Sequence, residues 1–169
     1  MNILENRRSF NESIGEFITA FAQVELYVTM YDAIIKTKNT KNLPLAGSFS
    51  VPVKKKLKNI SRFILEGFNK DFNECWVEIQ KEIMDLYLFR NHIIHGTGAS
   101  SFYGEYTKTM IDEDQQLLQL NFKNLSIEDI KKLSQRTYHV LTGDNGIQGV
   151  FMQEFLKISR SLFSQSNLT

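Results

Sequence analysis

The sequence predicts a mainly all-α protein: an up-and-down bundle of four to five helices with an inserted β-hairpin at about residues 102–122. Apolar residues recur at steps of three and four over several long segments, which is the spacing of one helix face. The chain has only two prolines and nine glycines, so long helices meet few breaks. One segment alone, after residue 97, loses the helical spacing.

The first predicted helix carries one continuous apolar stripe of about seven turns. Ser9 or Asn11 is a plausible N-cap for it. So long a stripe requires a similarly long partner, in the same chain or in a second copy. The stripe consists of Phe10, Ile14, Phe17, Phe21, Val24, Val28, Tyr31 and Ile35.

A loop and a lysine-rich helix follow. Residues 37–52 hold Lys, Asn, Gly, Ser and both prolines, a composition typical of a connection. The run Lys54, Lys55, Lys56 with Lys58 then opens a helix, where lysines oppose the helix dipole. Two interpretations stay open for this run: a solvated helix face, or a patch that contacts phosphates.

The third predicted helix begins near Asp71 or Asn73 as its cap and has its apolar stripe from Trp76 to Ile93. It ends in the hexapeptide at residues 90–95, Arg-Asn-His-Ile-Ile-His. Gly96 follows at the position of a C-terminal glycine cap.

From residue 97 to 124 the pattern becomes aromatic and Thr-rich, which favours strands. We expect strands at 102–110 and 117–122, with a turn at 111–114.

A fourth helix starts at Ser126, with Ser126 as N-cap and Asp129 in the first turn. Residues 143–146, Gly-Asp-Asn-Gly, end it, and a last helix carries the stripe from Val150 to Leu162.

Length and composition indicate a single domain over residues 1–169, with the hairpin inserted at about 97–124. Hydrophobic residues are 42% and charged residues 23%, as in ordinary globular proteins.

A net charge of +1 restricts any nucleic-acid contact to a local patch. The single Cys75 excludes an intramolecular disulfide and suits a reducing compartment. With no signal core and no membrane-length apolar run, we expect a cytoplasmic protein without membrane contact.

The hexapeptide combines residue types that can cleave a phosphodiester without a metal. Arg90 would stabilise negative charge on the phosphate, and His95 would act as general acid or base. The two are about 140° apart around a regular helix, but the last turn can unwind and let them converge. Asn91, four residues before His95, lies on the same face and could orient its imidazole or bind the ribose.

Other residues near the hexapeptide carry weaker signals. His92 and His95 lack further ligands at metal-binding spacing, so we expect no metal and no cofactor. His92 points to another face and suits a structural role, while Glu25 on the first helix is a candidate to orient Arg90. The competing interpretation is a helix end with polar residues, where the dipole favours His95 and Arg90 pairs with a carboxylate.

Residues 90–95 match the R-x-x-x-x-H motif of HEPN domains (higher eukaryotes and prokaryotes nucleotide-binding), which the chain resembles in this motif and, in outline, in its helices. Asn91 after the arginine and Gly96 after the histidine also match many members. The resemblance implies a HEPN-like bundle and a metal-independent endoribonuclease, typically a toxin or an antiviral defence effector. Arg90, Asn91 and His95 would be its catalytic residues.

The resemblance also implies partners. RNA would be the substrate, and two copies would form a homodimer with both motifs facing one cleft. Many members are neutralised by an antitoxin such as a minimal nucleotidyltransferase. The inserted hairpin departs from the minimal bundle. The alternative function is a non-catalytic helical module that binds a partner protein or a nucleotide, because function depends on the site and not on the fold.

Overall fold

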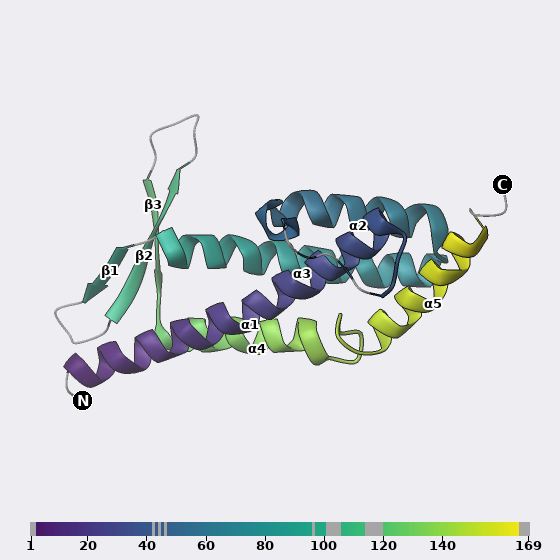
Figure 1. Ribbon diagram of the computed structural model, residues 1–169. Helices are drawn as coiled ribbons and strands as arrows, with labels where there is room; N and C mark the ends of the chain where they lie inside the picture. The colour runs from purple at the N-terminus through teal and green to yellow at the C-terminus, as the bar shows by residue number, and fades with distance from the viewer. Residues whose placement is uncertain are drawn as a thin grey trace. The chain divides into compact units, whose positions relative to one another are not determined.

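Five α-helices and a three-stranded antiparallel sheet make up the described part of the computed structural model (Figure 1). The structure describes residues 3–41, 43, 45, 47–95, 97–100, 106–113 and 120–165. The chain is mainly helical, which confirms the all-α prediction. The helices are α1 (Ile3–Thr37), α2 (Val53–Gly67), α3 (Lys70–His95), α4 (Ile127–Thr142) and α5 (Val150–Gln165), with a short 3-10 turn, η1, at Ser48–Ser50. The strands are β1 (Thr97–Ser100), β2 (Tyr106–Glu113) and β3 (Leu120–Leu125).

The chain divides into two compact units. The motif unit comprises Met1–Phe21 and Asp85–Thr137, and the aromatic unit comprises Ala22–Met84 and Tyr138–Thr169. The hexapeptide and the sheet belong to the motif unit, whereas α2 and α5 belong to the aromatic unit. That the whole chain behaves as a single domain stays a prediction.

The aromatic unit has a core of contacting rings. Tyr31 of α1 meets Phe155 of α5 edge-on, with ring centroids 4.6 Å apart, and Phe72 of α3 stacks on Phe151 of α5 at 4.3 Å. The Tyr31 hydroxyl donates a 2.7 Å hydrogen bond to the carbonyl of Ile147, and burial raises the pKa of this phenol. Each such ring contact adds roughly 0.5–1.5 kcal/mol beyond area burial, so the rings fix how these helix segments pack.

The first helix follows its apolar stripe but has different ends from those predicted. It begins at Ile3, before both predicted caps, because the residues ahead of Phe10 tolerate a helix. Arg8 of this segment also pairs with Glu12 one turn later, at 2.9 Å. Near the C-terminal end Ile34 is buried (1% exposed) and Ile35 only partly so, which corrects the last position of the stripe.

The start of α3 also differs from the prediction. The helix begins at Lys70, and the side chain of Asn69 accepts a 2.9 Å hydrogen bond from the backbone N–H of Phe72. Asn69 is therefore the N-cap, in place of Asp71 or Asn73. Asp71 instead lies in the first turn, where a carboxylate is favoured by the helix dipole.

The fourth helix starts as the sequence predicts. The hydroxyl of Ser126 lies 3.2 Å from the backbone nitrogen of Asp129, whose carboxylate accepts a 2.9 Å hydrogen bond from the backbone N–H of Ser126. This reciprocal arrangement is a capping box, and it confirms Ser126 as the N-cap.

The sheet lies in the motif unit, in the segment for which the sequence predicted an inserted hairpin. Strand β2 pairs antiparallel with both β1 and β3, so that Thr109 lies opposite Thr97 of β1 and opposite Asn124 of β3. The strands use the β-branched and aromatic residues of this segment, which suit a pleated backbone.

The predicted turn of the hairpin at residues 111–114 is wrong. Ile111 pairs with Phe122, and Glu113 pairs with Leu120, so β2 continues through most of these positions. The acidic residues there resemble turn formers, but pairing with β3 overrides that local preference. Residues 101–105 and 114–119, which include parts of both predicted strands, lie outside the described residues.

Candidate active site

Helix α3 carries the hexapeptide on its last turns, within the motif unit. Ile93 is fully buried, while Ile94 is 44% exposed. Arg90, Asn91 and His92 are each half-buried. The helix ends at His95, as the sequence predicts, although Gly96 lies outside the described residues. Arg90, Asn91 and His92 thus lie at the edge of the buried face of α3 and not on its most solvated side.

Arg90 and Asn91 are joined directly. Nη1 of Arg90 donates a 3.1 Å hydrogen bond to the side-chain carbonyl oxygen of Asn91. Consecutive residues diverge by about 100° around a helix, so the arginine side chain bends across the helix surface to reach its neighbour. The amide of Asn91 therefore holds the guanidinium of Arg90 in place. From the sequence, Asn91 was expected to orient the imidazole of His95 or to bind the ribose.

The position of the imidazole of His95 relative to Arg90 stays a prediction. The backbone of His95 is the last residue of α3, and its side chain lies outside the described part of the chain. Convergence of Arg90 and His95, and a contact between Asn91 and His95, are accordingly untested.

His92 lies on a face of α3 that also carries Asp85, two turns earlier. Asp85 forms a salt bridge with Arg136 of α4. This face is thereby directed toward α4 within the motif unit, which is compatible with the structural role expected for His92.

Glu25, the predicted orienter of Arg90, belongs to the aromatic unit. Its backbone carbonyl accepts a 2.7 Å hydrogen bond from the hydroxyl of Thr29 on the next turn. Burial lowers the pKa of Lys56, and the carboxylate of Glu25 acts against that shift, as Asp32 does more strongly. The proposed action of Glu25 on Arg90 stays a prediction.

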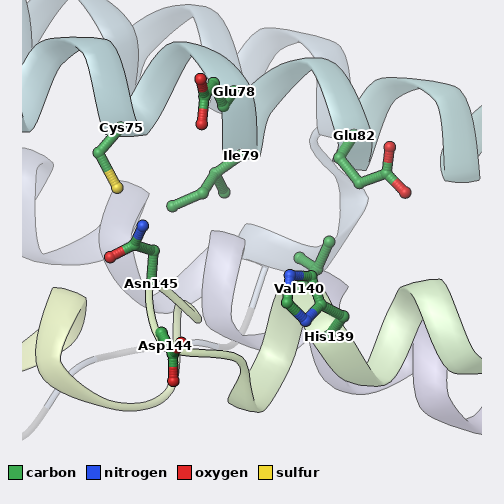
Figure 2. Close-up of a pocket in the computed structure, with 8 residues that line it drawn as sticks. All are labelled: Cys75, Glu78, Ile79, Glu82, His139, Val140, Asp144 and Asn145. Carbon is green, nitrogen blue, oxygen red and sulfur yellow. The ribbon is translucent and has the colours of Figure 1, made fainter.

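A pocket of about 310 Å³ lies in the aromatic unit, between residues of α3 and the end of α4 (Figure 2). Burial, and secondarily the negative charge of Glu78, raises the pKa of the Cys75 thiol, which therefore stays protonated and weakly nucleophilic. His139 also lines this pocket, although its position in the sequence gave it no role. The lining residues are Cys75, Glu78, Ile79, Glu82, His139, Val140, Asp144 and Asn145.

No group of three or more His, Cys, Asp or Glu side chains is arranged to hold a metal ion in the described ranges. Likewise, none of the helices there combines the length and the apolar character needed to cross a membrane.

A buried charge lies within the lysine run of α2. Lys56 was grouped with its lysine neighbours as a surface residue, but its side chain is only 2% exposed. The sequence does indicate that Lys56 differs from its neighbours. On a helical wheel, position 56 lies next to the apolar face defined by Leu57 and Ile60, whereas Lys54 and Lys58 lie on the far side.

Comparisons of the chain with protein-family models, with curated proteins and with solved structures found no match.

Proposed function

We propose that the protein is a metal-independent endoribonuclease of the HEPN type, with Arg90, Asn91 and His95 as its catalytic residues. The observation that carries the proposal is the hydrogen bond from Arg90 to Asn91 on the last turns of α3. It preorganises a guanidinium at a helix end that also bears a histidine. Preorganised donors stabilise charge that develops in a transition state.

The proposed reaction starts at the ribose. His95, as base, removes the proton of a 2′-hydroxyl group, and the resulting oxyanion attacks the adjacent phosphorus. The bond from phosphorus to the 5′-oxygen breaks, and that oxygen takes up a proton from an imidazolium. Arg90 neutralises the charge that builds on the nonbridging oxygens. The products are a 2′,3′-cyclic phosphate and a 5′-hydroxyl group.

The proposal includes a homodimer in which two motifs face one RNA strand. Supporting it, Leu88 and Ile94 are each 44% exposed on the same helix as the motif, and apolar side chains of this size at a surface favour association. In this proposal the protein acts in the cytoplasm as a toxin or antiviral effector, with an antitoxin such as a minimal nucleotidyltransferase as its natural restraint.

The test is cleavage of a mixed RNA pool in the presence of EDTA, read on a denaturing gel. We expect wild-type protein to cleave, and His95→Ala and Arg90→Ala to slow cleavage by roughly 10²-fold or more. His139→Ala and Arg160→Ala change the same residue types in the aromatic unit and serve as matched controls that should keep full activity. An inert wild type, or variants of the motif that cleave like the controls, would refute the assignment.

A second candidate is a non-catalytic module that binds a partner protein through the end of α3. The same exposed Leu88 and Ile94 favour it, because they would fit an apolar partner surface equally well. Expression in a host separates the two functions. A ribonuclease should slow growth, and His95→Ala should relieve that effect, whereas a binding module should leave growth independent of His95.

A further inference from the structure

The basic residues of the chain are not spread evenly along it. Residues 33–65 contain eight of its 20 Lys and Arg residues and none of its 19 Asp and Glu residues. The net charge of +1 thus conceals one strongly cationic segment and an acidic remainder. The segment includes η1 and nearly all of α2, both in the aromatic unit.

Four of these cations form one face of α2. At about 100° per residue, Lys54, Lys55, Lys58 and Arg62 fall within an arc of about 100°. All four are exposed, and none of them forms an ion pair within the described ranges. The opposite face is apolar and buried in the unit, with exposures of 5% or less, and consists of Val53, Leu57, Ile60 and Ile64.

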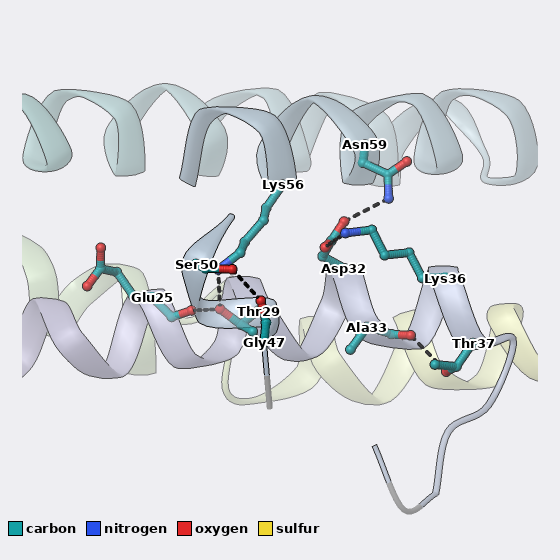
Figure 3. Close-up of polar contacts among 10 residues, drawn as sticks. All are labelled: Glu25, Thr29, Asp32, Ala33, Lys36, Thr37, Gly47, Ser50, Lys56 and Asn59. Carbon is teal, nitrogen blue, oxygen red and sulfur yellow. Dashed lines mark hydrogen bonds and ion pairs between the residues drawn. The ribbon is translucent and has the colours of Figure 1, made fainter. Parts of the chain in front are cut away.

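The nearby acidic charge is turned inward. Asp32 of α1 is 1% exposed, pairs with Lys36 and accepts a 2.8 Å hydrogen bond from Asn59 (Figure 3). Lys56 is buried beside it and donates a 2.8 Å hydrogen bond to the hydroxyl of Thr29. The carboxylate of Asp32 is thus engaged in this buried polar layer and does not neutralise the exposed lysines on the solvent side of α2.

An exposed aromatic ring lies in η1, just ahead of α2 in the chain. Phe49 of η1 is 57% exposed, and its ring centroid lies 5.6 Å from Nζ of the buried Lys56. The turn that presents it is closed by a 2.6 Å hydrogen bond from the hydroxyl of Ser50 to the carbonyl of Gly47, whose φ of 79° suits glycine. A cation–π contact thus orients the ring while leaving much of it open to solvent.

We propose that this surface, formed by Phe49, Lys54, Lys55, Lys58 and Arg62, binds single-stranded RNA, with the cations on phosphates and the ring stacked on a base. Charge complementarity and a stacking platform beside a cationic row are the features that single strands require. The choice of RNA rests on the proposed function. A lipid surface fits less well, because the apolar face of α2 is buried and cannot insert into a bilayer.

The experiment measures binding separately from cleavage. The probe is a fluorescent 12-nucleotide 2′-O-methyl RNA, which lacks the nucleophilic hydroxyl group, and binding is read by anisotropy over a range of salt. Lys54→Glu with Lys58→Glu should weaken binding about tenfold or more at low salt and reduce the slope of log K against log salt by roughly 1.4. Lys81→Glu with Lys157→Glu changes the net charge equally at exposed sites outside the surface and should bind like wild type.

Phe49→Ala tests the stacking contact. It should weaken binding about fivefold or more without changing the salt slope, because stacking releases no counterions. Leu65→Ala is the control, since Leu65 is 73% exposed on the same helix face but beyond the basic row.

Several results would overturn the inference: no binding by wild type, equal losses in the surface variant and its charge-matched control, or binding only to vesicles of anionic lipid. Circular dichroism shows that each variant is folded. A protein that binds the probe through this surface yet cleaves no RNA would refute the nuclease and leave the inference standing. A protein that cleaves RNA but binds the probe equally well with Lys54→Glu and Lys58→Glu would refute only the inference.

Discussion

At the residue scale, the contact between Arg90 and Asn91 is the feature of the candidate site that the structure defines best. A neutral amide accepts from the guanidinium at 3.1 Å, which orients the arginine and leaves its positive charge intact. A site that acts on phosphate needs both properties, since orientation without net charge would not stabilise a dianionic transition state.

Asn91→Asp tests whether cleavage needs the positive charge of Arg90 as well as the orientation of its guanidinium. The aspartate keeps an oxygen at the same position but neutralises Arg90 through a charge-assisted hydrogen bond. We expect RNA cleavage in EDTA to fall by about tenfold or more, while Asn91→Ser, which keeps the charge and shortens the side chain, should lose less. Rates on one defined RNA measure this, and equal rates for Asn91→Asp and wild type would show that the charge of Arg90 plays no part.

The buried Lys56 makes stability depend on pH. Burial lowers the pKa of its ammonium, while Asp32 and then Glu25 act to raise it and Lys36 to lower it. Between the lowered pKa and the ordinary lysine value of 10.5, the folded protein binds fewer protons than the unfolded protein. The free energy of unfolding due to this group therefore rises with pH across that window and is lost as pH falls through the lowered pKa.

Urea unfolding of wild type and Lys56→Met at several pH values up to 10 measures that contribution. Methionine fills similar volume without titrating, so it serves as the reference. We expect wild type to gain stability relative to Lys56→Met as pH rises. A difference that stays constant with pH would show that the pKa of Lys56 is the same in both states.

At the element scale, local sequence signals decide some boundaries and tertiary contacts decide others. The capping box at Ser126 and the end of α3 at His95 were predictable, because short-range chemistry specifies them. The N-cap of α3 was misplaced by at least two residues, because Asn69, Asp71 and Asn73 are all good caps by type and only the backbone decides among them. The course of β2 through residues 111–113 depends on pairing with β3, which the local sequence does not encode.

The turn between α4 and α5 leaves no room for a side chain at Gly146. A Cβ atom at Gly146 would lie 2.5 Å from the carbonyl oxygen of Leu141, which is backbone and cannot rotate away. We expect Gly146→Ala to lower the free energy of unfolding by about 1–3 kcal/mol. Gly149→Ala is the matched control, because the nearest atom to its Cβ would be 4.0 Å away.

Thermal and urea unfolding of both glycine variants test this prediction. Gly149→Ala should remain within about 0.5 kcal/mol of wild type. Similar losses in the two variants would mean that the turn adapts at both positions, and that the packing of Gly146 does not limit the connection.

At the scale of the whole molecule, the spacing of apolar residues predicted the fold class, whereas average composition concealed the charge pattern. Helical periodicity was sufficient to predict an all-α chain, because long apolar stripes with this spacing are typical of amphipathic helices that pack on one another. The net charge of +1 led to the expectation that any nucleic-acid contact is a local patch, and averaging removed the contrast between residues 33–65 and the rest. The sequence could not show that Lys56 is buried or that the exposed ring of Phe49 lies beside its ammonium group, because both depend on how α1, α2 and η1 pack.

The central claim is that Arg90, Asn91 and His95 cleave RNA by attack of the 2′-hydroxyl group without a metal. Mass spectrometry of the RNA ends formed by wild-type protein in EDTA tests it most directly. The account predicts 2′,3′-cyclic phosphate and 5′-hydroxyl ends, and their loss with His95→Ala. No cleavage, ends bearing a 3′-hydroxyl group and a 5′-phosphate, or the same ends at the same rate from His95→Ala would contradict it.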